Sequence, residues 1–272
     1  MRPDSDSQAD ENPFTVWSDT FRNVTIGQAK LIVAEGVDDQ WVDGLWNAPG
    51  ADAEDDAGSA AGEKIVHRQR GHDNVECAGP AGIDRVYAKR YRVRAGHSIL
   101  RRLGPNRARR EGAGHRAFAE KGIPTPRLLV YGDTRKAGLF VEGIVATVVL
   151  DAANLIEHYR STGEKEMIWE ATRFLARIHT GGLAHGDACL RNFVVSGSSA
   201  MALDLPSWSR LSRKAWLNDL TRFFGTGLKL TADKDFVSHL MDAYHEAYGG
   251  FPAKRAALFA RAEAYAVETS RP

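Results

Sequence analysis

The chain contains little cysteine, no apolar leader and no long hydrophobic run. Its 272 residues include two cysteines, Cys77 and Cys189, which can form one pair at most. This excludes a disulfide scaffold and indicates a reducing compartment. The first fourteen residues are polar and lack the apolar core of a signal peptide. The longest apolar stretch, 138–155, is interrupted by Glu142 and Asp151 and is too short and charged to cross a bilayer. We therefore expect a cytoplasmic protein that can still touch a membrane surface.

The net charge of +1 is also small, but it hides an asymmetry along the chain. Residues 1–62 hold thirteen acidic and three basic residues, so the remainder carries a net positive charge. The basic residues are densest over 85–110, where ten of them stand without an acid among them. Such a run is typical either of a solvated face or of a surface for phosphate-rich ligands. Charge alone favours the solvated face.

The hydrophobic pattern divides the chain into three parts. Residues 1–62 are predicted to be an acidic extension and linker, partly disordered, with short apolar runs over 24–33 and a short helix near 41–46. Residues 63–143 are predicted to form a strand-rich lobe with one helix, and residues 144–272 a mainly helical lobe with a small hairpin. The predicted strands are 64–70, 74–77, 85–91, 128–131, 139–142, 193–195 and 201–203, with a turn at 132–133 in the second pair. The predicted helices are 105–121, 164–180, 214–224, 235–248 and 252–267. The fold class is α+β, and a cleft between the lobes is the natural ligand site.

The segment His185-Gly186-Asp187-Ala188-Cys189-Leu190-Arg191-Asn192 carries the strongest chemical signal. It lies between a predicted amphipathic helix and a short strand, and its Asp and Asn are five residues apart, as in the catalytic loop of kinases. Phosphoryl transfer needs a carboxylate that orients and deprotonates the attacking hydroxyl, a role that suits Asp187. It also needs a neutral oxygen for magnesium, which Asn192 offers. Asp204 ends the next predicted hairpin and is expected to be the main magnesium ligand.

The first lobe supplies the candidate nucleotide-binding residues. Lys89, in the strand segment Val-Tyr-Ala-Lys, is expected to hold the α- and β-phosphates of ATP, and Glu111 on the next helix to pair with it. Glu142, at the end of the second strand pair, is assigned to the same nucleotide-binding group. Asp219 is either a brace for the catalytic loop or a surface helix acid, and the two are equally weighted. Each residue alone has an ordinary alternative as a cap, turn or solvated side chain; their order and spacing together favour a kinase site.

These motifs resemble the lipopolysaccharide kinase family, which phosphorylates Kdo or heptose in the inner core. The resemblance covers roughly residues 64–250. It is carried by residues 86–91, by Asn106 to Glu111, by Gly122-Ile123-Pro124-Thr125-Pro126 and by the catalytic loop. It implies a two-lobed protein-kinase-like fold and an ATP- and Mg²⁺-dependent sugar kinase at the cytoplasmic face of the inner membrane. We expect ATP and a core sugar as ligands, peripheral contact with that membrane, and no nucleic acid.

Several departures keep other functions open. A Gly-x-Gly-x-x-Gly loop is missing before Lys89, and only residues 70–73 offer a phosphate-covering turn. Cys189 stands where many kinases place a cation, and Arg191 is a candidate for the missing charge. The alternatives are a kinase for another small hydroxyl substrate, an atypical protein kinase, or an ATP-binding pseudoenzyme. The basic run favours an anionic acceptor, and Arg101 and Arg102 are predicted to bind it.

Overall fold

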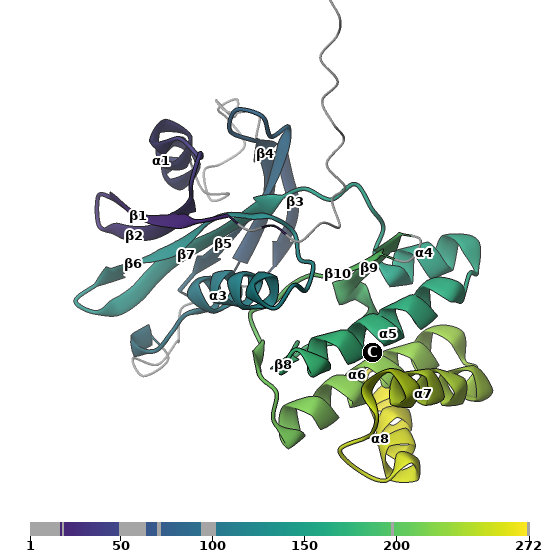
Figure 1. The fold of residues 1–272 in the computed structure, drawn as a ribbon. Coiled ribbons are helices and arrows are strands. Elements are labelled where there is room, and N and C mark those ends of the chain that lie inside the picture. Colours follow the sequence, from purple (N-terminus) through teal and green to yellow (C-terminus); the bar gives the residue numbers. More distant parts are fainter. Residues whose placement is uncertain are drawn as a thin grey trace, which may run out of the picture.

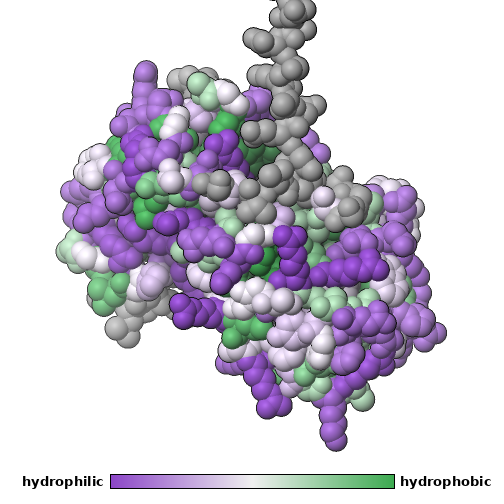
Figure 2. Space-filling view, in the orientation of Figure 1, coloured by the Kyte–Doolittle hydropathy of each residue, from purple (hydrophilic) through white to green (hydrophobic). Residues whose placement is uncertain are grey.

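The chain folds into two lobes joined by one connection (Figure 1). The computed structural model describes residues 17, 19–48, 64–69, 72–93, 102–196 and 199–270. Polar residues dominate the face seen in Figure 2, with hydrophobic ones in small scattered patches. Among the described residues, the buried apolar side chains gather instead in three clusters, two in the first lobe and one in the second, which also includes Phe118 and Ile123 from the first. Within the described residues, no helix is both long and apolar enough to cross a membrane.

The first lobe is built on a seven-stranded antiparallel sheet, ordered β1-β2-β6-β7-β5-β4-β3. The strands are β1 (Phe21–Ile26), β2 (Ala29–Ala34), β3 (Lys64–Gln69), β4 (His72–Ala78), β5 (Arg85–Arg92), β6 (Leu128–Lys136) and β7 (Leu139–Val148). Side chains of β2, β5, β6 and β7 fill two clusters on opposite faces of the sheet. Helix α1 (Asp39–Asn47) contributes Val42 and Leu45 to one cluster, and α3 (Arg107–Glu120) contributes Ala108 to the other.

The sheet corrects the predicted start of the first lobe. Strand β2 pairs with β6, with Leu31 opposite Gly132 and Val33 opposite Val130. Residues 21–47 are therefore part of the lobe, whereas the prediction assigned them to an extension outside it. The acidic residues of this segment lie among apolar residues that are buried in the core. The acidic composition therefore does not indicate that the segment lies outside the lobe. Residues 1–16, 18 and 49–63, including the predicted linker, lie outside the described residues.

Gly132 also explains why the predicted turn at 132–133 is wrong. A Cβ at this position would lie 2.3 Å from the Lys30 carbonyl oxygen, so glycine is needed for β2 to approach β6. The hairpin turns later, at Ala137 and Gly138, which both have positive φ angles, 50° and 78°. Positive φ at both central residues matches the two-residue hairpin turn that continues the twist of the strands. Strand β7 then runs to Val148, so the sheet extends past the predicted lobe boundary at 143.

Helix α3 crosses one face of the sheet below β6 and β7 (Figure 1). Asn106 caps it by accepting a hydrogen bond from the Arg109 backbone N–H at 3.0 Å. Its two interior glycines, which disfavour a helix in isolation, allow close packing. A Cβ at Gly112 would lie 2.1 Å from the Tyr131 ring, and one at Gly114 would lie 2.6 Å from Trp208. The predicted helix is confirmed, and its weak propensity is offset by these contacts.

The second lobe is mainly helical, as predicted. Its helices are α4 (Leu155–Thr162), α5 (Glu166–Thr180), α6 (Arg213–Thr231), α7 (Lys234–Tyr248) and α8 (Arg255–Glu268). The predicted hairpin is β9 (Phe193–Ser196) with β10 (Ser199–Ala202), and a second small ladder pairs β8 (Leu183–Ala184) with β11 (Ser209–Arg210). Helix α4 was not predicted, because only Leu155 among its eight residues is buried. The catalytic-loop segment runs from β8 through a 3₁₀ turn, η1 (Leu190–Asn192), into β9.

Candidate active site

A cleft of about 610 Å³ lies between the lobes. The sheet, α3 and the connecting segment 148–150 line one side of it, and the loop and strand ends of the second lobe line the other. Five of the six predicted site residues line this cleft: Lys89, Glu111, Asp187, Asn192 and Asp204. Residues separated by up to 115 positions in the sequence are therefore brought to one cavity.

Lys89 joins the two lobes electrostatically. Its Nζ lies 2.7 Å from Glu111 Oε1 and 2.8 Å from Asp204 Oδ1. Glu111 is 2% exposed, and the Tyr91 hydroxyl donates a hydrogen bond to its second oxygen. Burial opposes the charge of Lys89, but attraction by Glu111 and Asp204 outweighs it and raises the pKa of the ammonium. The predicted Lys–Glu pair is thus formed, with a charged amine facing the cleft.

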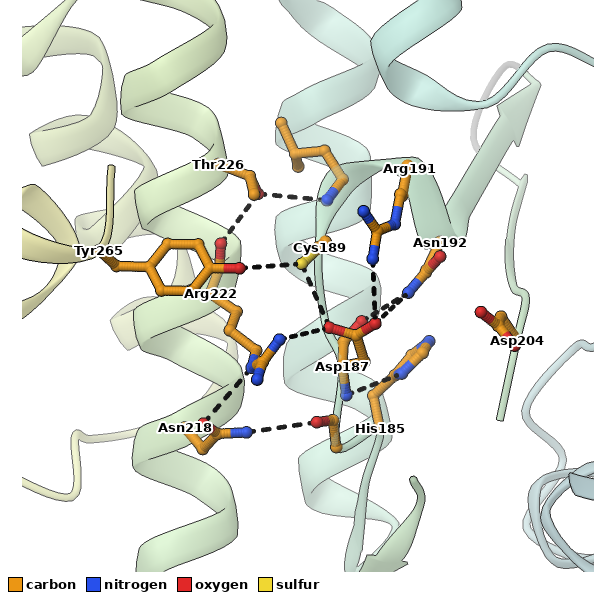
Figure 3. Close-up of polar contacts among 12 residues, drawn as sticks. His185, Asp187, Cys189, Arg191, Asn192, Asp204, Asn218, Arg222, Thr226 and Tyr265 are labelled. Atoms are coloured by element: carbon orange, nitrogen blue, oxygen red, sulfur yellow. Dashed lines mark hydrogen bonds and ion pairs between the residues drawn. The ribbon is translucent and has the colours of Figure 1, made fainter. Parts of the chain in front are cut away.

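The loop of the second lobe places Asp187 beside Asn192 (Figure 3). The Asn192 Nδ2 donates to the Asp187 backbone oxygen at 2.7 Å and approaches its carboxylate Oδ2 at 3.3 Å. Gly186 makes this turn possible: its φ is +81°, and a Cβ there would lie 1.9 Å from the Ser207 carbonyl oxygen. The five-residue spacing therefore corresponds to one tight, cross-linked turn.

Asp219 holds the same loop from α6. Its carboxylate is fully buried and accepts hydrogen bonds from the His185 and Gly186 backbone N–H groups at 2.7 and 2.8 Å. The side chain of His179 lies 3.3 Å from it. Of the two roles left open by the sequence, the structure assigns the brace and not the surface acid.

Asp204 follows the β9–β10 hairpin and lies beside Asn192. The Leu203 backbone N–H donates to the Asn192 carbonyl oxygen at 2.9 Å, so Asn192, just before β9, and Asp204, just after β10, lie at the same end of the hairpin. Asp204 has a φ of 55°, an uncommon conformation for a residue with a side chain and one found at functional sites. Burial is the largest single influence and would raise its pKa, but the charge and hydrogen bond of Lys89, with smaller contributions from His185 and Arg107, together outweigh it and lower the pKa, so the carboxylate is ionised.

The donor set at this point suits magnesium. Asn192 turns its amide nitrogen to Asp187, which leaves its oxygen on the other side (Figure 3), and Asp204 offers an ionised carboxylate. Mg²⁺ prefers such oxygen ligands, usually one or two from the protein together with phosphates. Among the described residues, no group of three or more His, Cys, Asp or Glu side chains could hold a metal. Asn192 and Asp204 therefore offer two of the oxygen ligands that such an ion needs.

Two predictions about charged residues need correction. Glu142 does not line the cleft; it lies on β7 opposite Arg92 and Thr134, three residues before Val145, where the strand reaches the cavity. Five of the seven described arginines of the basic run, most of them half-exposed, bond within the protein to acids and carbonyl groups of other elements. These are Arg85 with Glu76 and Asp151, Arg90 with Leu45, Arg92 with Asp73, Arg102 with Phe140, and Arg109 with Asp133. Arg94 and Arg101 lie outside the described residues.

Some residues of the site were not found from the sequence. Arg107 is exposed and lines the cleft, with its guanidinium 5.9 Å from the centre of the Tyr91 ring. Asn74 on β4 also lines it, and so does His72, which belongs to the predicted phosphate-covering turn at 70–73. Arg222 on α6 binds Asp187, although it is 35 positions further along. Its one sequence signal is a position three residues after Asp219, on the same side of that helix.

A β-rich lobe with a Lys–Glu pair, a helical lobe with an Asp-x₄-Asn loop, and a further aspartate between them define a protein-kinase-like phosphotransferase. The model of the lipopolysaccharide kinase (Kdo/WaaP) family matches residues 57–245. The chain belongs to this family and is a kinase.

A solved structure agrees on the fold, and a second one is more distantly similar. A structure of WaaP in complex with acyl carrier protein aligns with a TM-score of 0.56 at 16% identity, covering 78% of this chain and 90% of that one. A structure of WbdD with the kinase inhibitor LY294002 aligns with a TM-score of 0.46 at 20% identity, covering 75% of this chain and 45% of that one. The comparison with curated proteins gave no match. The two-lobed fold predicted from the sequence is confirmed.

Proposed function

We propose that this kinase transfers the γ-phosphate of ATP to a hydroxyl of Kdo or heptose in the lipopolysaccharide inner core, with Mg²⁺ as its metal. The observation that carries the proposal is the meeting of Lys89, Asp204 and the Asp187–Asn192 turn in one cleft. A pseudoenzyme would need only part of this set. All the groups that phosphoryl transfer requires are present, which favours catalysis.

The roles follow from the chemistry of each side chain. Lys89, fixed by Glu111, holds the α- and β-phosphates. The apolar residues Val148, Val149 and Leu150 line the cleft where the lobes join and suit the base of the nucleotide. Asp204 and Asn192 would hold Mg²⁺, which would supply positive charge to neutralise the phosphates. Asp187 orients the acceptor hydroxyl and takes its proton as the new P–O bond forms and the bond to ADP breaks.

The proposed acceptor is anionic, and we expect Arg107, which lines the cleft, to bind it; Arg102 bonds to the Phe140 carbonyl oxygen, and Arg101 lies outside the described residues. Arg107 and Arg191 both line the cleft and are exposed, so they can reach a carboxylate or phosphate on a core sugar. Arg107→Gln should raise the KM for a delipidated core oligosaccharide, leave the KM for ATP unchanged, and weaken the dependence of acceptor KM on salt. Arg110→Gln, on the same helix and exposed outside the cleft, is the matched control. Equal responses of the two variants would contradict an anionic-acceptor site at Arg107.

The metal role can be tested without an acceptor. Calorimetric titration of ATP with and without Mg²⁺ should show metal-dependent binding to the wild type. Asp204→Ala should reduce the metal-dependent part by about 10- to 100-fold or more, because the variant loses an ionised ligand. Glu142→Gln, which changes an acid outside the cleft, should bind as the wild type does. Unchanged metal dependence in Asp204→Ala would contradict the assignment.

A further inference from the structure

Arg222 binds the carboxylate of Asp187 from helix α6. Its NH1 lies 2.6 Å from Asp187 Oδ1, the shortest polar contact given for that carboxylate. Arg222 is three residues after Asp219, so both project from one side of α6. Asp219 fixes the backbone before Asp187, and Arg222 fixes its side chain. One helix therefore sets both the position of the loop and the orientation of its carboxylate.

Arg222 is itself held in place (Figure 3). Its Nε donates to Asn218 Oδ1 at 3.4 Å, and the Asn218 Nδ2 donates to the Gly186 carbonyl oxygen at 3.3 Å. The guanidinium lies over the ring of Tyr265 on α8, 5.7 Å from the ring centre. A planar guanidinium held on several sides loses little further freedom when it binds a carboxylate. The contact with Asp187 is therefore preorganised.

The two oxygens of Asp187 have different surroundings. Oδ1 accepts from Arg222 and from the Cys189 thiol at 3.3 Å. Oδ2 is approached by Arg191 and Asn192, each at 3.3 Å. Arg191 lines the cleft and its side chain is 61% exposed, whereas Arg222 does not line the cleft. Arg222 therefore holds Oδ1 from the side away from the cleft. Oδ2 lies toward the cavity, and its contacts are longer, so an entering hydroxyl can displace them.

Cys189, the loop residue that contacts Oδ1, brings no charge to that oxygen. Burial raises the pKa of its thiol, so the group next to Oδ1 is a neutral donor. Its sulfur also lies 3.5 Å from the Tyr265 hydroxyl, on the same side as Arg222. The cation missing two residues after Asp187 is therefore supplied by α6. Arg191, the candidate from the sequence, contacts the other oxygen.

We propose that Arg222 is the positioning residue of the transfer step, which pins Asp187 through Oδ1 so that Oδ2 meets the acceptor hydroxyl. The inference rests on the role of Asp187 in the proposed function. It predicts that Arg222 affects turnover and not nucleotide binding, because it acts through a residue that contacts the acceptor.

Steady-state kinetics of three variants test this. Arg222→Gln should lower kcat by roughly 10- to 100-fold, since small misplacements of a reacting group have effects of this size. Its KM for ATP should stay within about twofold of the wild type. Arg222→Lys should recover part of kcat, because the ammonium restores the charge and one hydrogen bond. Arg213→Gln, an arginine of the same helix bonded to the Pro252 carbonyl oxygen, should leave kcat unchanged.

A double-mutant cycle separates positioning from a structural role. In an Asp187→Asn background, adding Arg222→Gln should lower the residual rate by less than about twofold, because the group it positions is already lost. An equal loss in both backgrounds, or near-normal kcat in Arg222→Gln, would overturn the inference. If Arg222→Gln does not fold, Arg222→Lys in both backgrounds gives the same comparison. Near-normal turnover of Asp187→Asn alone would instead overturn the proposed function.

Discussion

A chain that begins at Glu63 should not fold, although composition predicts that the acidic first quarter is dispensable. The deletion removes β1, β2 and α1 and leaves β6 as an open edge of the sheet. It also removes Trp17, whose indole N–H donates to Thr125 at 3.2 Å, and Asp19, which forms a two-contact ion pair with Arg127. The first lobe would lose both a layer of its core and contacts to the segment after α3.

The size of the effect follows from the buried residues that are lost. Leu31, Val33, Val37, Val42 and Leu45 are all at most 6% exposed. Burying each contributes about 1.5–3 kcal/mol, so the five together contribute roughly 7–15 kcal/mol before any allowance for a compact unfolded state. Whole domains are stable by about 5–15 kcal/mol. The deletion therefore removes stabilisation of the same size as the total.

Urea denaturation and size-exclusion chromatography of purified chains test this prediction. The chain from residue 63 should be aggregated or lack a cooperative transition, and a chain from residue 17 should unfold as the full-length protein does. Gly132→Ala gives a finer test, because its Cβ would meet the Lys30 carbonyl oxygen and separate β2 from β6. A soluble, cooperatively folded chain from residue 63 with an unchanged midpoint would refute the assignment of these strands to the lobe.

Two other predictions concern stability and the loop. Burial lowers the pKa of His115 to about 3 from 6.5, so the unfolded chain binds more protons between these values. The free energy of unfolding should fall as pH drops below about 6.5, by up to about 1.4 kcal/mol per pH unit from this group, and His115→Leu should flatten that slope in urea titrations. Gly186→Ala should lower both kcat and stability, because its Cβ would lie 1.9 Å from the Ser207 oxygen. Gly163→Ala, at a φ of +73° with nothing within 4 Å, should lower stability alone; equal kcat values would contradict the role of the tight turn.

The catalytic loop was predictable because its chemistry is local. Asp187 and Asn192 belong to one turn, so their spacing alone fixes their relation. The Lys89–Glu111 pair was found through a strand and the helix that follows it, and the structure confirms the contact. Helices with a clear apolar face, such as α5 and α7, were also found within a few residues.

Pairings between distant segments could not be predicted. Strand β2 pairs with β6 about a hundred residues further along the chain. The hydrophobic pattern of neither strand identifies which strand it pairs with. The pairing of the basic run could not be predicted for the same reason. Arg109 forms an ion pair with Asp133 on β6, and Arg85 forms one with Asp151, beyond the end of β7. Arg222 reaches Asp187 only because α6 packs behind the loop. A list of charges carries no information about such partners.

The most direct test of the account is phosphate transfer by the purified kinase to a defined acceptor. The protein is incubated with ATP, Mg²⁺ and lipid A core species that end in Kdo or heptose, and the products are analysed by mass spectrometry. The wild type should add one phosphate to a core sugar. Asp187→Asn should bind ATP normally and transfer roughly two to four orders of magnitude more slowly. Transfer by Asp187→Asn at a near-normal rate, or ATP binding by the wild type without transfer to either sugar, would contradict the account.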